Sequence, residues 1–319
     1  MKAPVVSVIM SVYNEPLQWV DSAIKSILNQ TFSDIEFIII NDNPRSEDLD
    51  NFLNLYAEKD SRIKIIKNRE NIGLTKSLNI GLSHANGKYI ARMDADDISH
   101  KDRFRKQVNF LDSNPDVTVC GTKIKLFGSR MPFFCHTIFE SDEDIRGQML
   151  LNSGFAHPTV MIRRSVLTEN NIRYDENFKT SQDYKLWWDL KDYGKYANIP
   201  EVLLNYRVSK SQISKIYSQQ QQGCKSDLSS LFRNSWINHL RTPDSLKNER
   251  DLILTKNIRK YLSNPYDKKM YAYFLRALQY QVFSFHNMIK CCFSTSTKIS
   301  VKERFIIAAL TLKHLLFKD

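Results

Sequence analysis

The stretch Ala91-Arg92-Met93-Asp94-Ala95-Asp96-Asp97 ends a predicted apolar strand in three carboxylates within four positions. Carboxylates this close repel one another, by about 4 kcal/mol for a pair ~4 Å apart at an effective dielectric constant near 20, unless protons or a cation intervene. Mg²⁺ and Mn²⁺ prefer such oxygen ligands. The stretch therefore predicts a metal site at a strand end. A solvated acidic turn that caps the following helix is the alternative.

On both sides of this stretch, strand and helix signals alternate through residues 1–130, which is typical of a parallel sheet covered by helices on both faces. We expect strands at 5–12, 35–41, 63–67, 88–93 and 117–126. Pro16 stands where the first turn of a helix tolerates proline. Asn71 and Ser99 are the expected N-caps of the next two helices. This pattern predicts an α/β sheet of the kind that binds nucleotides.

Polar groups follow three of the predicted strands. They are Tyr13-Asn14-Glu15, Asn41-Asp42-Asn43 and the Asp94 group. Open α/β sheets bind ligands at the carboxyl ends of their strands, so we expect these groups to share one edge. For Asp42, ordinary turn chemistry before Pro44 is the alternative. The glycine motifs of dinucleotide-binding and P-loop proteins are missing from the sequence, so phosphate binding would use a metal and side chains.

Composition narrows the class of protein. The hydrophobic content of 42% and charged content of 25% are those of a globular protein. The net charge of +11 favours an anionic partner, but no nucleic-acid-binding motif is present, so we expect none. The five cysteines lack the spacing of a zinc site or a disulfide framework. No apolar stretch reaches the roughly 20 residues of a spanning helix, and the expected location is the cytoplasm.

The rest of the chain divides into two further parts. Residues 131–208 mix helix and strand signals, with a strand through 159–162 and a helix over 182–192, and we expect them to form the second wall of a cleft. From residue 209 the pattern becomes helical. We therefore expect one α/β domain over 1–208 and a helical C-terminal region over 209–319.

Four segments, taken in order, carry a resemblance to a known family. They are 5–15, the pair 71–74 and 78–81, 87–97, and 182–187 with its Gln182-Asp183-Tyr184. The chain resembles the inverting GT-A glycosyltransferases of family two from roughly Val5 to Ser214, and is most similar to the subgroup that builds lipopolysaccharide, capsule and exopolysaccharide in bacteria. The resemblance implies a Rossmann-like, mostly parallel sheet with flanking helices. It also implies transfer from a UDP-sugar to a glycan or lipid-linked saccharide, with Mn²⁺ or Mg²⁺ as cofactor.

The resemblance also implies roles for particular residues. To nucleotide-sugar binding it assigns Tyr13, Glu15, Asp42, Lys76, Asn79, Arg92 and Asp94, with Asp42 accepting a hydrogen bond from a uracil ring nitrogen. It assigns the metal to Asp94 and Asp96, the general base to Asp183, and the acceptor side to His157 and Trp187. For His157 a structural histidine is the alternative, and of Trp187 and Trp188 one is expected in the core.

A general base at Asp183 also makes chemical sense, because inversion in one step needs a carboxylate opposite the departing diphosphate. A capping carboxylate at the start of a helix is the alternative. The family pattern is broken at Asn43-Pro44, where Gly-Ser is common, at Gln182, where Glu is common, and at Ser209, where a histidine is common. The last departure leaves a third metal ligand open.

Two further expectations concern partners. A non-catalytic nucleotide- or glycan-binding scaffold of the same fold is the alternative to an enzyme. Residues 301–318 read as a basic, amphipathic helix that would dock the protein on the anionic inner face of the plasma membrane. Packing of this helix on the catalytic domain or on a second subunit of a homo-oligomer is the alternative.

Overall fold

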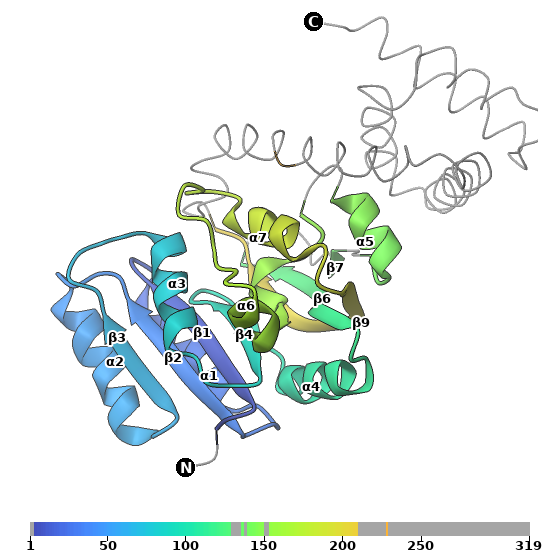
Figure 1. Ribbon diagram of the computed structural model, residues 1–319. Helices are drawn as coiled ribbons and strands as arrows, with labels where there is room; N and C mark the ends of the chain where they lie inside the picture. Colours follow the sequence, from blue (N-terminus) through green and yellow to red (C-terminus); the bar gives the residue numbers. More distant parts are fainter. Residues whose placement is uncertain (1–2, 129–134, 137–138, 150–152, 210–227, 229–319) are drawn as a thin grey trace, which may run out of the picture. The chain divides into compact units, whose positions relative to one another are not determined.

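The computed structural model of the chain describes residues 3–128, 135–136, 139–149, 153–209 and 228 (Figure 1). The helical region expected over 209–319, including the basic helix at 301–318, lies outside the described residues except for Ser209 and Leu228. Among the described residues, no helix combines the length and the apolar character needed to cross a membrane.

The strands are β1 (Val6–Val12), β2 (Ile35–Asn41), β3 (Ile63–Lys67), β4 (Tyr89–Asp94), β5 (Ile98–Ser99), β6 (Val117–Phe127), β7 (Cys135–His136), β8 (Met161–Arg163) and β9 (Lys195–Arg207). The helices are α1 (Leu17–Leu28), α2 (Glu47–Lys59), α3 (Leu74–His84), α4 (Arg103–Ser113), α5 (Asp142–Gln148), α6 (Arg164–Glu169) and α7 (Gln182–Leu190), and a single 3₁₀ turn covers His157–Thr159.

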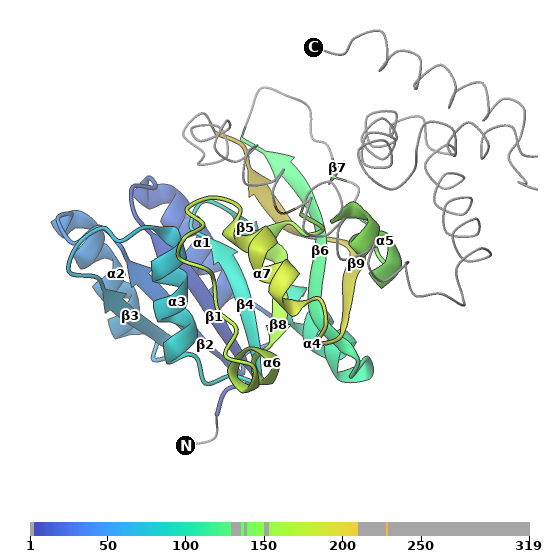
Figure 2. The same cartoon turned by 45° about the horizontal axis from the view of Figure 1, so that its top comes forward.

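One mixed sheet joins the described strands in the order β3-β2-β1-β4-β8-β6-β9-β5, with β7 beside β6. Strands β3, β2, β1 and β4 are parallel, as the sequence predicts. The change comes at β8, which runs antiparallel to both β4 and β6. Figure 2 shows the sheet extending from β3 on one side to β6 and β9 on the other. The parallel half therefore ends beside β4, where the acidic stretch begins.

Strand β1 lies between β2 and β4 in the parallel half and is buried along its whole length. Every residue of β1 is buried, and its alternate residues Val6, Val8, Met10 and Val12 belong to the main hydrophobic core. On the other face, α3 approaches Ile9 closely: a Cβ added at Gly81 would lie 2.4 Å from Ile9 Cγ2. Glycine at this position lets the second half of α3 pack closely against the sheet.

The five strands predicted within residues 1–130 agree with the structure to within one residue at each end, whereas two predicted caps are wrong. Helix α3 follows Gly73, in the left-handed conformation at φ 84°, and not Asn71. Helix α4 follows Asp102, because Ser99 belongs to β5. The strand expected over 159–162 is also shifted, since the chain makes the 3₁₀ turn before β8 begins at Met161.

Candidate active site

The acidic turn after β4 brings three carboxylates together. One oxygen from each of Asp94, Asp96 and Asp97 lies within 4.8 Å of the others. Asp94 and Asp96 are partly exposed, whereas Asp97 is buried. Asp97 Oδ1 accepts a hydrogen bond from the backbone N–H of Arg207 at 2.7 Å, and its Oδ2 has no partner among the described residues. A buried carboxylate oxygen without a donor indicates that a cation or proton belongs here.

The electrostatics of this turn support the same conclusion. Burial, followed by the charges of Asp94 and Glu15, raises the pKa of Asp96 to about 7. Burial, followed by Asp94 and Asp96, raises the pKa of Asp97 well above its ordinary value. Burial also raises the pKa of Glu15, to which Asp94 contributes. The turn and the end of β1 therefore hold more negative charge than the protein neutralises, and these residues fit a divalent cation.

Arg92 is the cation on the protein side of this turn. It is only 3% exposed, and its Nη2 donates to Asp94 Oδ1. Its Nε and Nη1 have no hydrogen-bond partner among the described residues. The fully buried Arg103 supports it from below, because Arg103 Nη2 donates to the carbonyls of Arg92 and Val160 at 2.8 and 3.3 Å. Two donors of the Arg92 guanidinium are thus buried without a partner in the described part of the chain, and Arg92 binds the acidic turn through Nη2.

Arg207, at the end of β9, binds the acidic turn through both its backbone and its side chain. Its Nε donates to the carbonyl oxygen of Asp96 at 2.7 Å, in addition to the bond from its backbone N–H to Asp97. The guanidinium lies 4.5 Å from the centre of the Trp19 ring and 4.4 Å from that of Phe127. This role of Arg207 was not predicted from the sequence. The sequence drew attention only to nearby Ser209, where the family commonly has a histidine.

Asp42, which the sequence predicts to contact the nucleobase, is buried and accepts three hydrogen bonds from the protein. Asp42 Oδ1 accepts from Asn68 Nδ2 at 2.6 Å and from the N–H of Ile72 at 3.0 Å, and Oδ2 accepts from the N–H of Gly73 at 3.0 Å. A carboxylate has about four acceptor positions, so one remains. Asp42 therefore holds the loop that leads into α3, and its contact with a uracil ring stays a prediction. Tyr13 is exposed, and its N–H donates to Glu15 Oε2 at 2.8 Å.

The two predicted donor residues of α3 differ in their surroundings. Lys76 is exposed in the first turn of the helix. Asn79 is instead bound to the segment after α6: its Oδ1 accepts from the N–H of Tyr174 at 3.0 Å, and its Nδ2 donates to the carbonyl of Tyr174 at 2.9 Å and to Glu176 at 3.1 Å. The amide of Asn79 thus holds the segment after α6, and its expected place beside the donor stays a prediction.

Asp183 lies in the first turn of α7, where the sequence predicts it, and is partly exposed. Its Oδ2 accepts from Ser153 Oγ at 3.3 Å. Ser181, which precedes the helix, has a left-handed backbone at φ 60°, and its buried Oγ has no partner within the described part of the chain. Strain of this kind persists only where the surroundings enforce it.

The residues predicted for the acceptor side, His157 and Trp187, make contacts within the protein. His157 Nε2 lies 2.8 Å from Tyr174 Oη, and burial, with a smaller contribution from Arg92, lowers the pKa of His157 well below its ordinary value. Trp187 is fully buried against Phe155, and its Nε1 donates to Ser153 Oγ at 3.1 Å. A sugar ring therefore has no access to Trp187, and its expected place on the acceptor surface is corrected: it supports Ser153, the partner of Asp183.

Tyr206 lies next to Arg207 at the end of β9, which binds Asp96 and Asp97. Burial first, then the charges of Asp94, Asp97, Asp96 and finally Asp183, raise the pKa of the Tyr206 phenol. The environment of this phenol therefore disfavours a further negative charge.

Comparisons with known proteins identify the family. Residues 7–170 match the family described as Glycosyl transferase family 2. The O-antigen biosynthesis glycosyltransferase WbnJ of Escherichia coli is 34% identical over 214 residues, which are 66% of this chain and 82% of that protein. The chain belongs to glycosyl transferase family 2.

Solved structures agree on the fold. TarS 1–349 of S. aureus in complex with UDP-GlcNAc matches with a TM-score of 0.57 at 18% identity, over 86% of this chain and 79% of that one. The mannosyltransferase PcManGT from Pyrobaculum calidifontis, in complex with GDP-Man and Mn²⁺, matches with a TM-score of 0.56 at 16% identity, over 100% of this chain and 89% of that one. The mixed sheet with flanking helices is the GT-A fold.

Proposed function

We infer that the protein is an inverting glycosyltransferase that moves a hexose or N-acetylhexosamine from a UDP-sugar to a saccharide or lipid-diphosphate-linked acceptor during synthesis of a bacterial surface polysaccharide. The observation that carries this proposal is the cluster of Asp94, Asp96 and Asp97, whose oxygens lie within 4.8 Å of one another at the end of β4, in a chain that belongs to glycosyl transferase family 2. A site for a cation-bound diphosphate and a separate carboxylate for the attacking hydroxyl are the two parts that inverting transfer requires. The O-antigen role of the relative WbnJ supports the choice of pathway.

The cofactor that we propose is Mn²⁺ or Mg²⁺, held by Asp94 and Asp96, with Asp97 behind them. The unpartnered Oδ2 of Asp97 and the raised pKa of Asp96 support a cation at this turn. When bound, such an ion neutralises the charge that develops on the departing diphosphate. The Mn²⁺ in the structure of PcManGT is consistent with this assignment.

Residues of the chain would hold the rest of the donor. Arg92 would favour the diphosphate through its positive charge and through its hydrogen bond to Asp94, because its two unpartnered donors are buried. Lys76 would add a second positive charge from the exposed side of α3. Tyr13 and Glu15 would border the base, with Asp42 offering its remaining acceptor position to a uracil ring nitrogen. The donors bound to TarS and PcManGT, UDP-GlcNAc and GDP-Man, support a nucleotide sugar but differ in the base.

Asp183 would act as the general base. Its carboxylate would take the proton of an acceptor hydroxyl while that oxygen attacks the anomeric carbon from the side opposite the diphosphate. The N-terminal turn of α7 favours an ionised carboxylate, and the hydrogen bond from Ser153 fixes its direction. Because one displacement occurs, the anomeric configuration is inverted.

A donor panel tests the proposal. Purified protein is incubated with UDP- and GDP-linked hexoses and N-acetylhexosamines, with Mn²⁺, Mg²⁺ or EDTA, and nucleotide release is measured with and without lipid-diphosphate acceptors. We expect release of UDP from at least one donor with a divalent ion and none with EDTA. Binding of a nucleotide sugar without release under any condition would favour the non-catalytic scaffold. Release in EDTA at the full rate would remove the metal.

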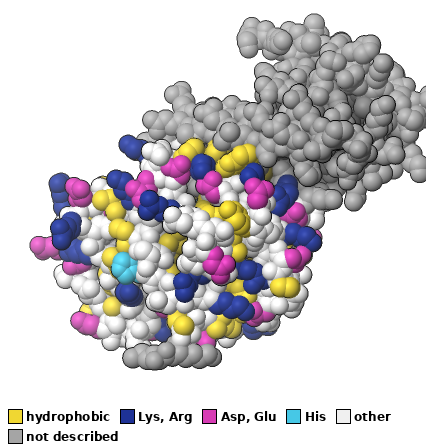
Figure 3. Space-filling model, in the orientation of Figure 1, with side chains coloured by type: hydrophobic (Ala, Val, Ile, Leu, Met, Phe, Trp, Pro, Cys, Tyr) yellow, Lys and Arg dark blue, Asp and Glu magenta, His cyan; other side chains and the backbone are white. Residues whose placement is uncertain are grey.

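The location that we propose is the cytoplasm, at the inner face of the plasma membrane. Basic and acidic side chains are interspersed on the face of the described domain seen in Figure 3. From Arg241 onward, in contrast, the sequence contains 15 Lys and Arg but only 6 Asp and Glu. The net charge of this part is therefore 15 − 6 = +9. Sedimentation with anionic vesicles tests this location: we expect binding in low salt, release in high salt, and loss of binding after deletion from Lys298 onward.

A further inference from the structure

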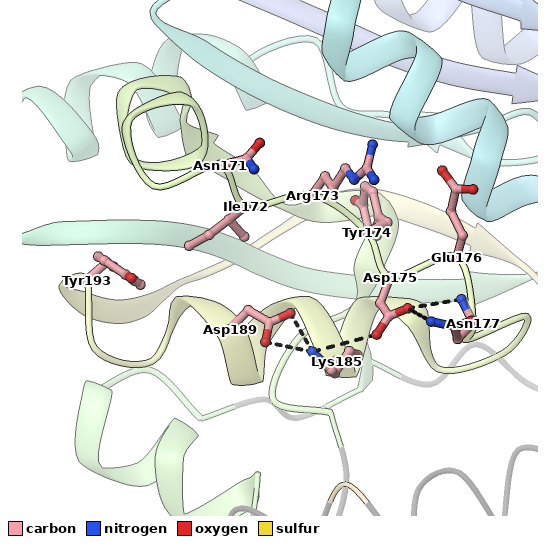
Figure 4. A pocket seen from close by; sticks show the side chains of 10 residues that line it. All are labelled: Asn171, Ile172, Arg173, Tyr174, Asp175, Glu176, Asn177, Lys185, Asp189 and Tyr193. Atoms are coloured by element: carbon pink, nitrogen blue, oxygen red, sulfur yellow. Dashed lines mark hydrogen bonds and ion pairs between the residues drawn. The ribbon is translucent and has the colours of Figure 1, made fainter.

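A groove lies between the segment that follows α6 and the outer side of α7. Residues 171–177 form one wall, and Lys185, Asp189 and Tyr193 form the other (Figure 4). Its volume of 470 Å³ is that of a small-molecule site, which typically has roughly 300–1,000 Å³. None of the donor or metal residues discussed above lines it. The groove is therefore separate from the residues proposed for the donor and the metal.

The polar groups of this groove are held in fixed positions. Lys185 Nζ donates to both carboxylate oxygens of Asp189, at 2.7 and 2.8 Å, and lies 3.9 Å from Asp175 Oδ2. Asp175 Oδ1 accepts from the N–H and the side chain of Asn177. Each carboxylate still has acceptor positions, and these point in directions that Lys185 and Asn177 determine. A ligand with several hydroxyl groups would meet a preorganised set of acceptors.

Charge and apolar surface narrow the class of ligand. The lining carries Asp175, Glu176 and Asp189 against Arg173 and Lys185, which is 3 − 2 = 1 surplus negative charge. A phosphate or nucleotide would be repelled. At one end Ile172 points toward Tyr193, whose ring is 44% exposed (Figure 4). An aromatic face beside carboxylates suits a sugar ring, which has an apolar face of C–H groups and a rim of hydroxyls.

We propose that this groove binds neutral sugar units of the acceptor glycan that lie several residues away from the reacting hydroxyl. The two walls of the groove also carry the acceptor side of the active site: Asp183 begins α7, and Tyr174 contacts His157 through its phenol. Asp183 lies on a different side of α7 from Lys185 and Asp189, so a glycan that reaches Asp183 would pass around the first turn of α7 to enter the groove. This proposal rests on the proposed function, because it takes the acceptor to be a saccharide.

The test compares Tyr193→Ala and Asp189→Asn with wild-type protein and with Leu55→Ala. Leu55 is the matched control, since it lies on α2 and is 52% exposed. Tyr193→Ala keeps the backbone bonds of Tyr193 to Leu190 and Thr118, so the fold is retained, which thermal melting checks. The probe is an array of neutral bacterial oligosaccharides of one to six sugar units, with phosphorylated counterparts.

We expect wild-type protein and Leu55→Ala to retain neutral oligosaccharides of three or more units, and Tyr193→Ala to bind them about tenfold more weakly. Asp189→Asn weakens the same ligands. Hydrolysis of the nucleotide-sugar donor stays at the wild-type rate in all three variants. The proposal that the groove binds sugar units is overturned if Tyr193→Ala binds the oligosaccharides as tightly as wild type does. It is also overturned if wild-type protein binds none of them. Absence of donor hydrolysis in wild-type protein that still binds oligosaccharides overturns the proposed function instead.

Discussion

The proposed donor half and the proposed acceptor half of the site are assembled in different ways. The donor half takes Glu15, Asp42 and Asp94 from the ends of the parallel strands β1, β2 and β4. Parallel strands end at one edge, so these groups converge without any further device. The acceptor half takes Asp183 and His157 from a short helix and a turn, which occupy no such common edge.

Hydrogen bonds between distant residues replace strand pairing in the acceptor half. The segment after α6 is attached to α3 by Asn79, which bonds to Tyr174 across 95 positions of sequence, and by Thr75 Oγ1, which donates to the carbonyl of Phe178. Asp183 itself is held by Ser153. This difference teaches that changes to the donor half should alter chemistry with the fold preserved, whereas changes to the acceptor half should alter chemistry and local order together.

The largest effect is expected for Asp96→Ala. Loss of this carboxylate removes a proposed metal ligand, and we expect transfer to fall roughly 10⁴-fold, which corresponds to several kcal/mol of charge stabilisation. Because repulsion within the acidic turn also falls, the metal-free variant should melt no lower than wild type. Transfer assays and calorimetric melting in EDTA measure both. A large loss of stability would mean that the donor half is not as independent as the comparison states.

Next in size is Asp183→Asn, for which we expect turnover to fall about 10³-fold, within the usual range for a general base. The amide keeps the shape of the side chain and can still accept from Ser153. Affinity for UDP, measured by titration calorimetry, should equal that of wild type. If UDP affinity collapsed while turnover stayed high, Asp183 would belong to the donor half.

A smaller effect is expected for Asn79→Ala, which tests the attachment between the halves. The substitution leaves the N–H and carbonyl of Tyr174 without their partner, so we expect stability to fall by about 1–3 kcal/mol. The KM for the acceptor should rise about tenfold, while donor hydrolysis changes little. Asn54→Ala, at an exposed position of α2, is the matched control and should be silent. A change in donor affinity alone would indicate that Asn79 contacts the donor.

The smallest effect is expected in the pH dependence of stability without metal. The pKa of Asp96 is raised to about 7, above its ordinary value of 3.8, so the folded protein binds this proton more tightly than the unfolded chain does. This contribution is complete below pH ~4 and is lost as the pH rises through ~7.

Melting of wild type and Asp96→Asn in EDTA from pH 4 to 8 checks this expectation. The melting temperature of wild type should fall relative to that of the variant by a few degrees over this range. Mn²⁺ should reduce the difference at pH 8. A constant difference at all values of pH would contradict the raised pKa.

Local patterns in the sequence were sufficient for much of the donor half. Alternation of apolar strands and amphipathic helices predicted the parallel sheet, and three carboxylates at a strand end predicted the acidic turn, because both signals lie within a few neighbouring residues. The placement of Asp183 in the first turn of a helix was predicted for the same reason. The caps at Gly73 and Asp102 were missed, since Asp42, 31 positions away, binds the N–H of Gly73 and so shapes the turn.

Only the tertiary structure decided which polar groups hold the site together. Arg207 binds Asp97 across 110 positions of sequence, and Asn79 binds Tyr174 across 95. Of the adjacent residues Trp187 and Trp188, the fold buries the first completely and leaves the second partly exposed. The strand and helix periods follow from neighbouring residues, whereas these contacts depend on the path of the whole chain, which no local pattern encodes.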